Sequence, residues 1–213
     1  MNNKLSAKQE ALAPIAAFTA AGQLDQLKIA LNEGLAAGLT VNEIKEALTQ
    51  LYAYAGFPRS LNALGVFMSV MKEREAKGLK DPVGLEASPL PTHQTKLELG
   101  AANQTRLVGA PVSGPLYEFA PAIDLFLKEH LFGAIFGRDN LDFPSREVVT
   151  VAALANLGGV NPQLESHFKV SLNIGLTEAQ LKNLVDILRN KVDPKAADNA
   201  AEVLESTLKK RAK

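Results

Sequence analysis

The sequence of 213 residues contains no cysteine and no tryptophan, and aromatic residues make up only 6% of it. A chain without thiols forms no disulfide, offers no thiolate to a metal and has no route to a thiol-based mechanism. Apolar residues nevertheless amount to 46%, which is enough to bury a core in one large domain or two small ones. Alanine and leucine dominate this fraction, and they favour closely packed helices over strands.

The chain also lacks an excess charge and a long apolar run. The 23 basic and 23 acidic side chains balance, so no global field attracts nucleic acid or an anionic membrane. Pro14 and Thr19 interrupt the apolar residues 12–21, which are too few to span a bilayer, and the opening residues do not show the pattern of a secretory leader. We therefore expect a cytoplasmic protein. The basic run at 209–213 is interpreted as the solvated end of a helix.

Glycine and proline divide the chain into segments with helical periodicity and hardly any strand-like alternation, which predicts an all-α fold. A linker rich in proline and glycine is predicted at 78–91. The predicted helices are 6–21, 23–37, 41–55, 59–77, 95–108, 118–135, 144–158, 161–175, 178–190 and 194–211.

One helical joint occurs twice, in residues 31–48 and 168–185. Each copy has leucines at helical spacing, then Gly-Leu-Thr, then a second amphipathic segment. The glycine suits the left-handed residue that ends a helix, and the threonine caps the next helix in a capping box with Glu43 or Gln180. A weaker match joins 9–22 to 146–159, which indicates an internal duplication.

The duplication predicts two helical units packed as a pseudo-dimer. Residues 1–77 form the first repeat, 78–117 a linker with a short helix, and 118–213 the second repeat. The alternative is one irregular bundle without internal symmetry.

Several segments carry a family likeness. The second repeat contains FLKEHLFGAIFGRDNLDFPSREVVTVAALANLGG (126–159) and QLESHFKVSLNIGLT (163–177), and the first contains YAYAGFPRSLNAL (52–64). With the lead-in helix at 97–109, their order resembles the carboxymuconolactone decarboxylase family of the alkyl hydroperoxidase D-like superfamily. The resemblance implies two such helical units in one chain, and a homo-oligomer, with three two-repeat chains forming a trimer.

The family's features are divided between the repeats. The Tyr-Ala-Gly-x-Pro segment occurs only in the first repeat, whereas the family histidine occurs only in the second, as His167. A site would therefore be shared, with Tyr54, Phe57 and Arg59 meeting His167.

The redox branch of the superfamily has a Cys-x-x-Cys motif ahead of this histidine. Val160 and Gln163 stand at those positions here, while Glu147 matches the acidic residue of the branch's proton relay. The relay partners are present without the thiols, so we do not expect thiol peroxidase activity.

His167 and Glu147 are the candidate catalytic pair, because a carboxylate at one ring nitrogen fixes the tautomer and makes the imidazole more basic. The alternative for His167 is a histidine satisfied by a backbone carbonyl. His130 is interpreted as a helix-end residue, and His93 as part of a surface loop or a helix start. The histidines show no metal-ligand spacing, and we expect neither a metal nor a cofactor.

A decarboxylase without cofactor must stabilise an enolate-like anion, return a proton to carbon and anchor the substrate's carboxylates. Arginine is the best anchor because its planar fork donates two hydrogen bonds to a carboxylate. Arg59 is the first candidate anchor and Arg146 the second, with a structural salt bridge as the alternative for Arg146. Tyr54 either donates to the oxyanion or packs within the helix.

Three functions follow from these residues. The first is cofactor-independent decarboxylation of a small carboxylated lactone or related acid. The second is a catalytically silent family member that binds a small molecule or forms an oligomer. The third keeps the proton-transfer site for lactone isomerisation or hydrolysis. The expected partners are a small carboxylic acid or lactone and further copies of the chain.

Overall fold

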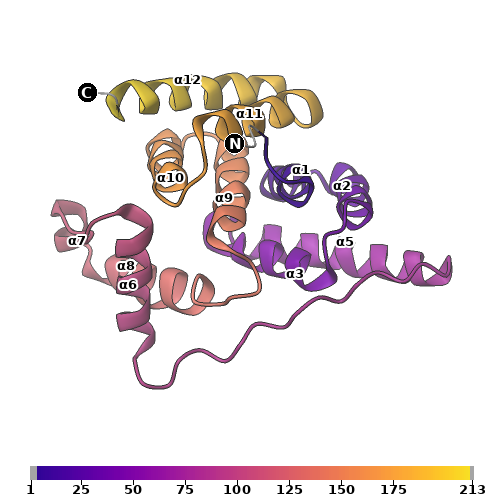
Figure 1. Ribbon diagram of the computed structural model, residues 1–213, viewed down its shortest axis with the longest axis horizontal. Coiled ribbons are helices and arrows are strands. Elements are labelled where there is room, and N and C mark those ends of the chain that lie inside the picture. Colours follow the sequence, from indigo (N-terminus) through magenta and orange to yellow (C-terminus); the bar gives the residue numbers. More distant parts are fainter. Residues whose placement is uncertain (1–3, 212–213) are drawn as a thin grey trace.

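The computed structural model describes residues 4–211, and these residues fold into helices without any β-strand, which confirms the all-α prediction. The helices follow the predicted ranges closely (Figure 1). In chain order they are α1 (Ala7–Ala21), α2 (Leu24–Ala36), α3 (Val41–Gln50), α4 (Tyr52–Ala55), α5 (Phe57–Ala76), α6 (Lys96–Val108), α7 (Pro115–Phe119), α8 (Pro121–Leu125), the π-helix η1 (Phe126–Ile135), α9 (Phe143–Leu157), α10 (Asn161–Asn173), α11 (Glu178–Lys191) and α12 (Pro194–Arg211).

Local capping chemistry explains the two repeated joints. Thr40 accepts a hydrogen bond from the backbone of Glu43, whose side chain accepts one in return, and Thr177 and Gln180 form the same capping box before α11. Gly38 and Gly175 have φ angles of 92° and 101°, which a residue with a Cβ rarely adopts. The predicted capping boxes are confirmed.

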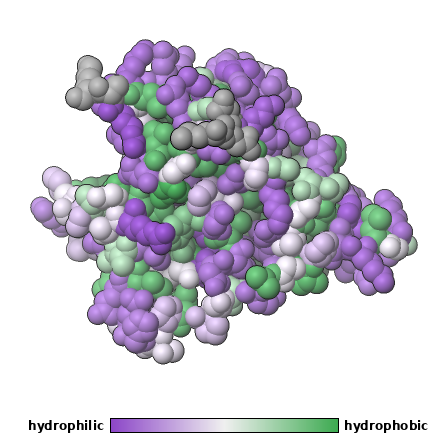
Figure 2. Space-filling model, viewed as in Figure 1, coloured by the Kyte–Doolittle hydropathy of each residue, from purple (hydrophilic) through white to green (hydrophobic). Residues whose placement is uncertain are grey.

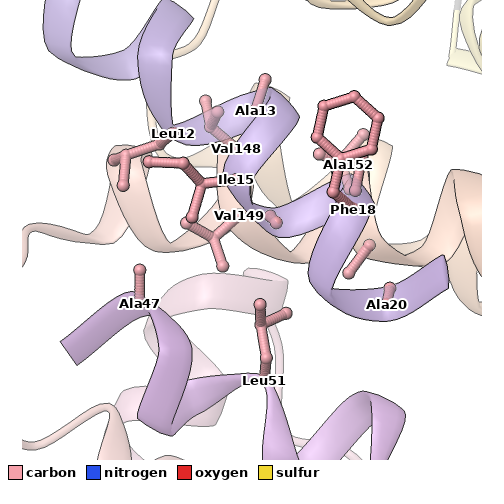
Figure 3. Close-up of a cluster of buried hydrophobic side chains, with 14 of the residues drawn as sticks. Leu12, Ala13, Ile15, Phe18, Ala20, Ala47, Leu51, Val148, Val149 and Ala152 are labelled. Carbon is pink, nitrogen blue, oxygen red and sulfur yellow. The ribbon is translucent and has the colours of Figure 1, made fainter. Parts of the chain in front are cut away.

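Helices α1 and α9 cross at the centre of the molecule, and their small side chains let the two backbones approach closely. Figure 3 shows Ala13 and Ile15 of α1 facing Val148, Val149 and Ala152 of α9. These residues belong to one buried cluster that also includes residues of α3, α5, α11 and α12. The two predicted repeats therefore contribute to a common core.

Corresponding helices of the two predicted repeats also have corresponding neighbours. Helix α2 packs against α1 and α5, while α10 packs against α9 and α12. This arrangement fits a duplication, although the repeat boundaries stay a prediction.

The segment between α5 and α6 crosses the lower edge of the molecule as an extended chain (Figure 1). Arg74 at the end of α5 donates two hydrogen bonds of 2.7 Å to the Asp81 carboxylate. The backbone carbonyls of Pro82 and Val83 then accept from the first two N–H groups of α3, at 3.0 and 2.9 Å. These groups have no partner inside the helix, so the crossing segment completes the start of α3.

Helix α6 pairs with η1 rather than standing alone as a linker helix. At this crossing, an added Cβ on Gly100 would overlap the Lys128 carbonyl, and one on Gly133 would overlap the Lys96 carbonyl. The single helix predicted at 118–135 is divided into α7, α8 and η1, because Pro115 and Pro121 each start a new helix. The helix predicted at 41–55 is likewise interrupted at Leu51.

None of the helices described in residues 4–211 combines the length and apolar character needed to cross a membrane.

Candidate active site

A pocket of about 940 Å³ lies between the α6–η1 pair, the short helices α7 and α8, and helices α9 and α10. Helix α10 contributes Gln163, Ser166, His167, Lys169, Val170 and Asn173 to the wall. Gln163, His167, Val170 and Asn173 follow one another by three or four residues, so a single helical face borders the pocket. In Figure 2, apolar surface is visible on the left, between α12 and the projection of α7 and α8.

His167 and Glu147 form a hydrogen-bonded pair on this wall, with 2.7 Å between Nδ1 and Oε2. The Glu147 side chain is fully buried and that of His167 is 15% exposed. The contact fits the tautomer that carries its proton on Nδ1, because an ionised carboxylate only accepts, and this tautomer leaves Nε2 free to accept a proton. The second carboxylate oxygen, Oε1, has no hydrogen-bond partner within the described part of the chain.

Tyr54 of α4 lies beside this pair and also lines the pocket. Its ring meets the His167 ring edge to face, with centroids 5.5 Å apart. The hydroxyl is buried near Thr150, but no hydrogen bond of ordinary geometry joins it to any described residue. Burial raises the pKa of the Tyr54 phenol far above its usual range, and the negative charge of Glu147 raises it further. Tyr54 is therefore a neutral potential donor.

Arg146 is fully buried in a network that joins α9 to α3, and it does not line the pocket. Its guanidinium donates to Glu46 Oε1 at 2.8 Å, to Gln50 Oε1 at 3.0 Å and to the carbonyls of Arg138 and Leu141. Four hydrogen bonds leave little capacity for a substrate carboxylate. This placement favours the salt-bridge alternative for Arg146.

Arg59 and Phe57 lie outside the pocket lining as well. The exposed Arg59 guanidinium rests against Gly22, so closely that a Cβ there would overlap it. Phe57 is 61% exposed and stacks on Tyr52 at 4.3 Å between ring centroids. Of the three first-repeat residues expected to meet His167, only Tyr54 lies beside it in the pocket.

The other two histidines also lie away from the pocket. His130 is exposed on η1 and packs against the Tyr52 ring, at 5.5 Å between ring centroids. His93 is exposed ahead of α6. Within residues 4–211, no three His, Asp or Glu side chains come together as metal ligands.

The structure adds pocket residues that the sequence interpretation missed. Gln104 of α6 is 4% exposed, and its amide makes no hydrogen bond to a described residue although it lines the pocket. Lys210 and Arg211, interpreted as a solvated helix end, line the pocket too. The three- and four-residue spacing from His167 could have indicated Gln163 and Val170, but no local pattern indicates side chains on α6 or α12.

The described residues thus define an all-helical protein without thiols, in which a histidine–carboxylate pair borders an apolar pocket. Residues 1–68, about a third of the chain, match the family model of the carboxymuconolactone decarboxylase family, which agrees with the resemblance over these residues. Tyr54, Phe57 and Arg59 lie within the matched residues, whereas Glu147 and His167 lie beyond them. No curated protein shows a significant match to the chain.

Proposed function

We propose that this protein is a cofactor-independent acid–base enzyme that decarboxylates a carboxylated lactone or a related carbonyl acid. The pair of His167 and Glu147 on the pocket wall carries the proposal, with its 2.7 Å hydrogen bond. A fully buried carboxylate at Nδ1 orients the ring and stabilises the imidazolium, as general acid–base catalysis requires.

In the proposed reaction, the bond between the carboxylate carbon and its neighbour breaks and carbon dioxide leaves. The bonding electron pair moves into the adjacent carbonyl group as an enolate. Protonated His167 then donates its Nε2 proton to the carbanionic carbon, and solvent restores that proton. The overall reaction consumes one proton and needs no oxidant or reductant.

Tyr54 acts as a positioning residue in this proposal. Its hydroxyl and Glu147 Oε1 are two buried polar atoms without partners in the same region. Because the phenol stays neutral, a small rotation or a bridging water lets it donate to this oxygen. Glu147 would then be held at both oxygens and the His167 ring at one orientation.

A catalytically silent binding protein is the second candidate function. It is favoured by the positions of Arg59 and Arg146, because neither proposed carboxylate anchor lines the pocket. The pocket amide of Gln104 offers a neutral polar contact instead. Isomerisation or hydrolysis of a lactone uses the same pair and stays a third reaction to test.

The proposal is tested by measuring carbon dioxide release from a panel of carboxylated lactones and β-keto acids. We expect His167→Gln to lower kcat/KM by about 100- to 10,000-fold, which is the usual contribution of a general acid or base. Glu147→Gln should lower kcat more than it raises KM, because it removes the charge that stabilises the imidazolium.

The matched control is His130→Gln, which changes an exposed histidine outside the pocket and should keep wild-type activity. If the wild type turns over a panel compound and His167→Gln does so at the same rate, His167 has no part in the mechanism. A wild type that binds members of the panel and turns none over would favour the silent binding protein.

A further inference from the structure

We propose that the pocket takes an amphipathic carboxylic acid, with its carboxylate at a basic rim formed by Lys169, Lys210 and Arg211 and its apolar body extending toward His167. The inference rests on the proposed function in that His167 is the reacting group. It names a class of ligand that differs from a compact carboxylated lactone.

The charge at the rim selects an anion. Among the described lining residues, Lys169, Lys210 and Arg211 are cations, and no Asp or Glu lines the pocket. Lys169 and Lys210 both bind the nearby Glu165 carboxylate, at 2.7 and 2.8 Å, and they hold its pKa at about 2. The three rim cations therefore outnumber the one carboxylate that pairs with two of them.

Arg211 is the rim cation that lacks an acidic partner among the residues described. Its Nη1 donates to Asn173 Oδ1 at 3.1 Å, and the Asn173 amide in turn donates to the Val108 carbonyl at 2.7 Å. The ends of α6, α10 and α12 therefore meet at this point. A guanidinium with donors to spare can hold a carboxylate there.

The walls beyond the rim select an apolar body. Leu127, Leu131 and Phe132 of η1 line the pocket together with Leu154 and Leu157 of α9. Leu116 of α7 and Ile123 of α8 complete the lining, although they remain 65% and 45% exposed. An apolar ligand would remove this surface from water, at about 25 cal/mol for each Å² buried.

The length of α10 sets the distance between the two ends of the ligand. Asn173, which holds Arg211, lies six residues beyond His167, or about 9 Å along the helix axis at 1.5 Å per residue. A ligand anchored by one carboxylate at Arg211 must therefore span about 9 Å before a second, reacting carboxylate and its carbonyl group lie at His167. The pocket of about 940 Å³ suits such a molecule, because it falls at the upper end of the ~300–1,000 Å³ range of ligand sites.

Binding of octanoate to the full chain tests the inference without any turnover. The chain has only three histidines, so their ring proton signals can be assigned in NMR spectra with the variants His93→Gln, His130→Gln and His167→Gln. We expect octanoate to shift the His167 signals and to leave those of His93 in place. Acetate, which has the charge without the apolar body, and octanamide, which has the body without the charge, should bind at least tenfold more weakly.

The double variant Lys210→Gln/Arg211→Gln should weaken octanoate binding about tenfold, because each exposed ion pair with the carboxylate contributes only modestly to affinity. Octanamide has no charge to pair with these residues, so its binding should stay unchanged. Lys209→Gln is the matched control, since Lys209 is a neighbouring cation that pairs with Glu205 and does not line the pocket. Equal binding of octanoate and octanamide, or no shift at His167, would overturn the inference.

The inference and the proposed function can fail separately. If octanoate shifts the His167 signals but no panel compound is decarboxylated, the result supports the proposed class of ligand and contradicts the proposed reaction. If a compact lactone is decarboxylated while the rim variants bind octanoate as tightly as the wild type, the result supports the proposed reaction and contradicts the proposed class of ligand.

Discussion

At the scale of single residues, burial decides what each polar side chain can do. Arg146 and Arg59 are chemically alike, yet one is enclosed by four hydrogen bonds and the other is exposed against Gly22. The Tyr54 hydroxyl and Glu147 Oε1 are buried oxygens that have no hydrogen-bond partner among the described residues. A buried polar atom without a partner costs about 1–3 kcal/mol, so its retention beside a pocket is consistent with a role in the site.

Tyr54 should make the stability of the protein depend on alkaline pH. Its folded pKa is raised above an unfolded value of about 10. The neutral phenol therefore contributes stability fully below pH ~10, and this contribution is lost as the pH rises toward the folded pKa. We expect the free energy of unfolding in urea to fall more steeply above pH 10 in the wild type than in Tyr54→Phe.

Near pH 7 the two proteins should differ by no more than about 1 kcal/mol, because the substitution removes a hydroxyl that lacks a partner. Parallel stability curves from pH 9 to 11 would contradict the assigned burial of Tyr54.

At the scale of elements, glycine decides how closely α6 and η1 can pack. Gly100 and Gly133 place each helix against backbone carbonyls of the other, and this pair encloses one side of the pocket. The helix predicted at 95–108 is present, but its sequence alone does not identify its partner.

Gly100→Ala should lower the free energy of unfolding by about 1–3 kcal/mol, since the new Cβ would overlap the Lys128 carbonyl and force the helices apart. Gly65→Ala is the matched control, because it adds the same methyl group to an exposed position of α5 with nothing within 4 Å. That control should gain about 0.5–1 kcal/mol from helix propensity. Chemical denaturation measures the free energy of unfolding of both variants. Equal changes in the two variants would argue against the close crossing of α6 and η1.

At the scale of the whole molecule, the two predicted repeats share the larger of the buried apolar clusters and one buried polar network. Leu12, Ala47 and Val148 belong to the same apolar cluster although they lie in different repeats. Arg146 of α9 joins Glu46 and Gln50 of α3. Neither repeat can unfold without exposing the other's buried surface.

We therefore expect a single unfolding transition, with coincident midpoints by circular dichroism at 222 nm and by tyrosine fluorescence. Arg146→Met should keep one transition but lower the free energy of unfolding by about 3 kcal/mol. The Glu46 side chain is only 2% exposed, and the substitution removes one of its two ion pairs and leaves the pair with Arg138. Two separate transitions in the wild type would show that the repeats are independent domains. The homo-oligomeric state and the cytoplasmic location stay predictions.

The sequence by itself determined the helices, their caps and the catalytic candidate pair. The Gly-Leu-Thr joints act within a few residues, and apolar spacing reports burial along a single helix, so both can be interpreted locally. The partnership of Glu147 with His167 was predicted from the family resemblance, and the 2.7 Å contact agrees with it.

Only the tertiary structure decided which side chains surround that pair. The pairing of α6 with η1 and the position of Arg211 at the pocket both depend on contacts between distant segments. Arg146 bonds to Glu46 across 100 residues of sequence, and no local pattern identifies such a partner. The same arginine chemistry could anchor a substrate or hold a core together, and the packing of helices around it selects between these two roles.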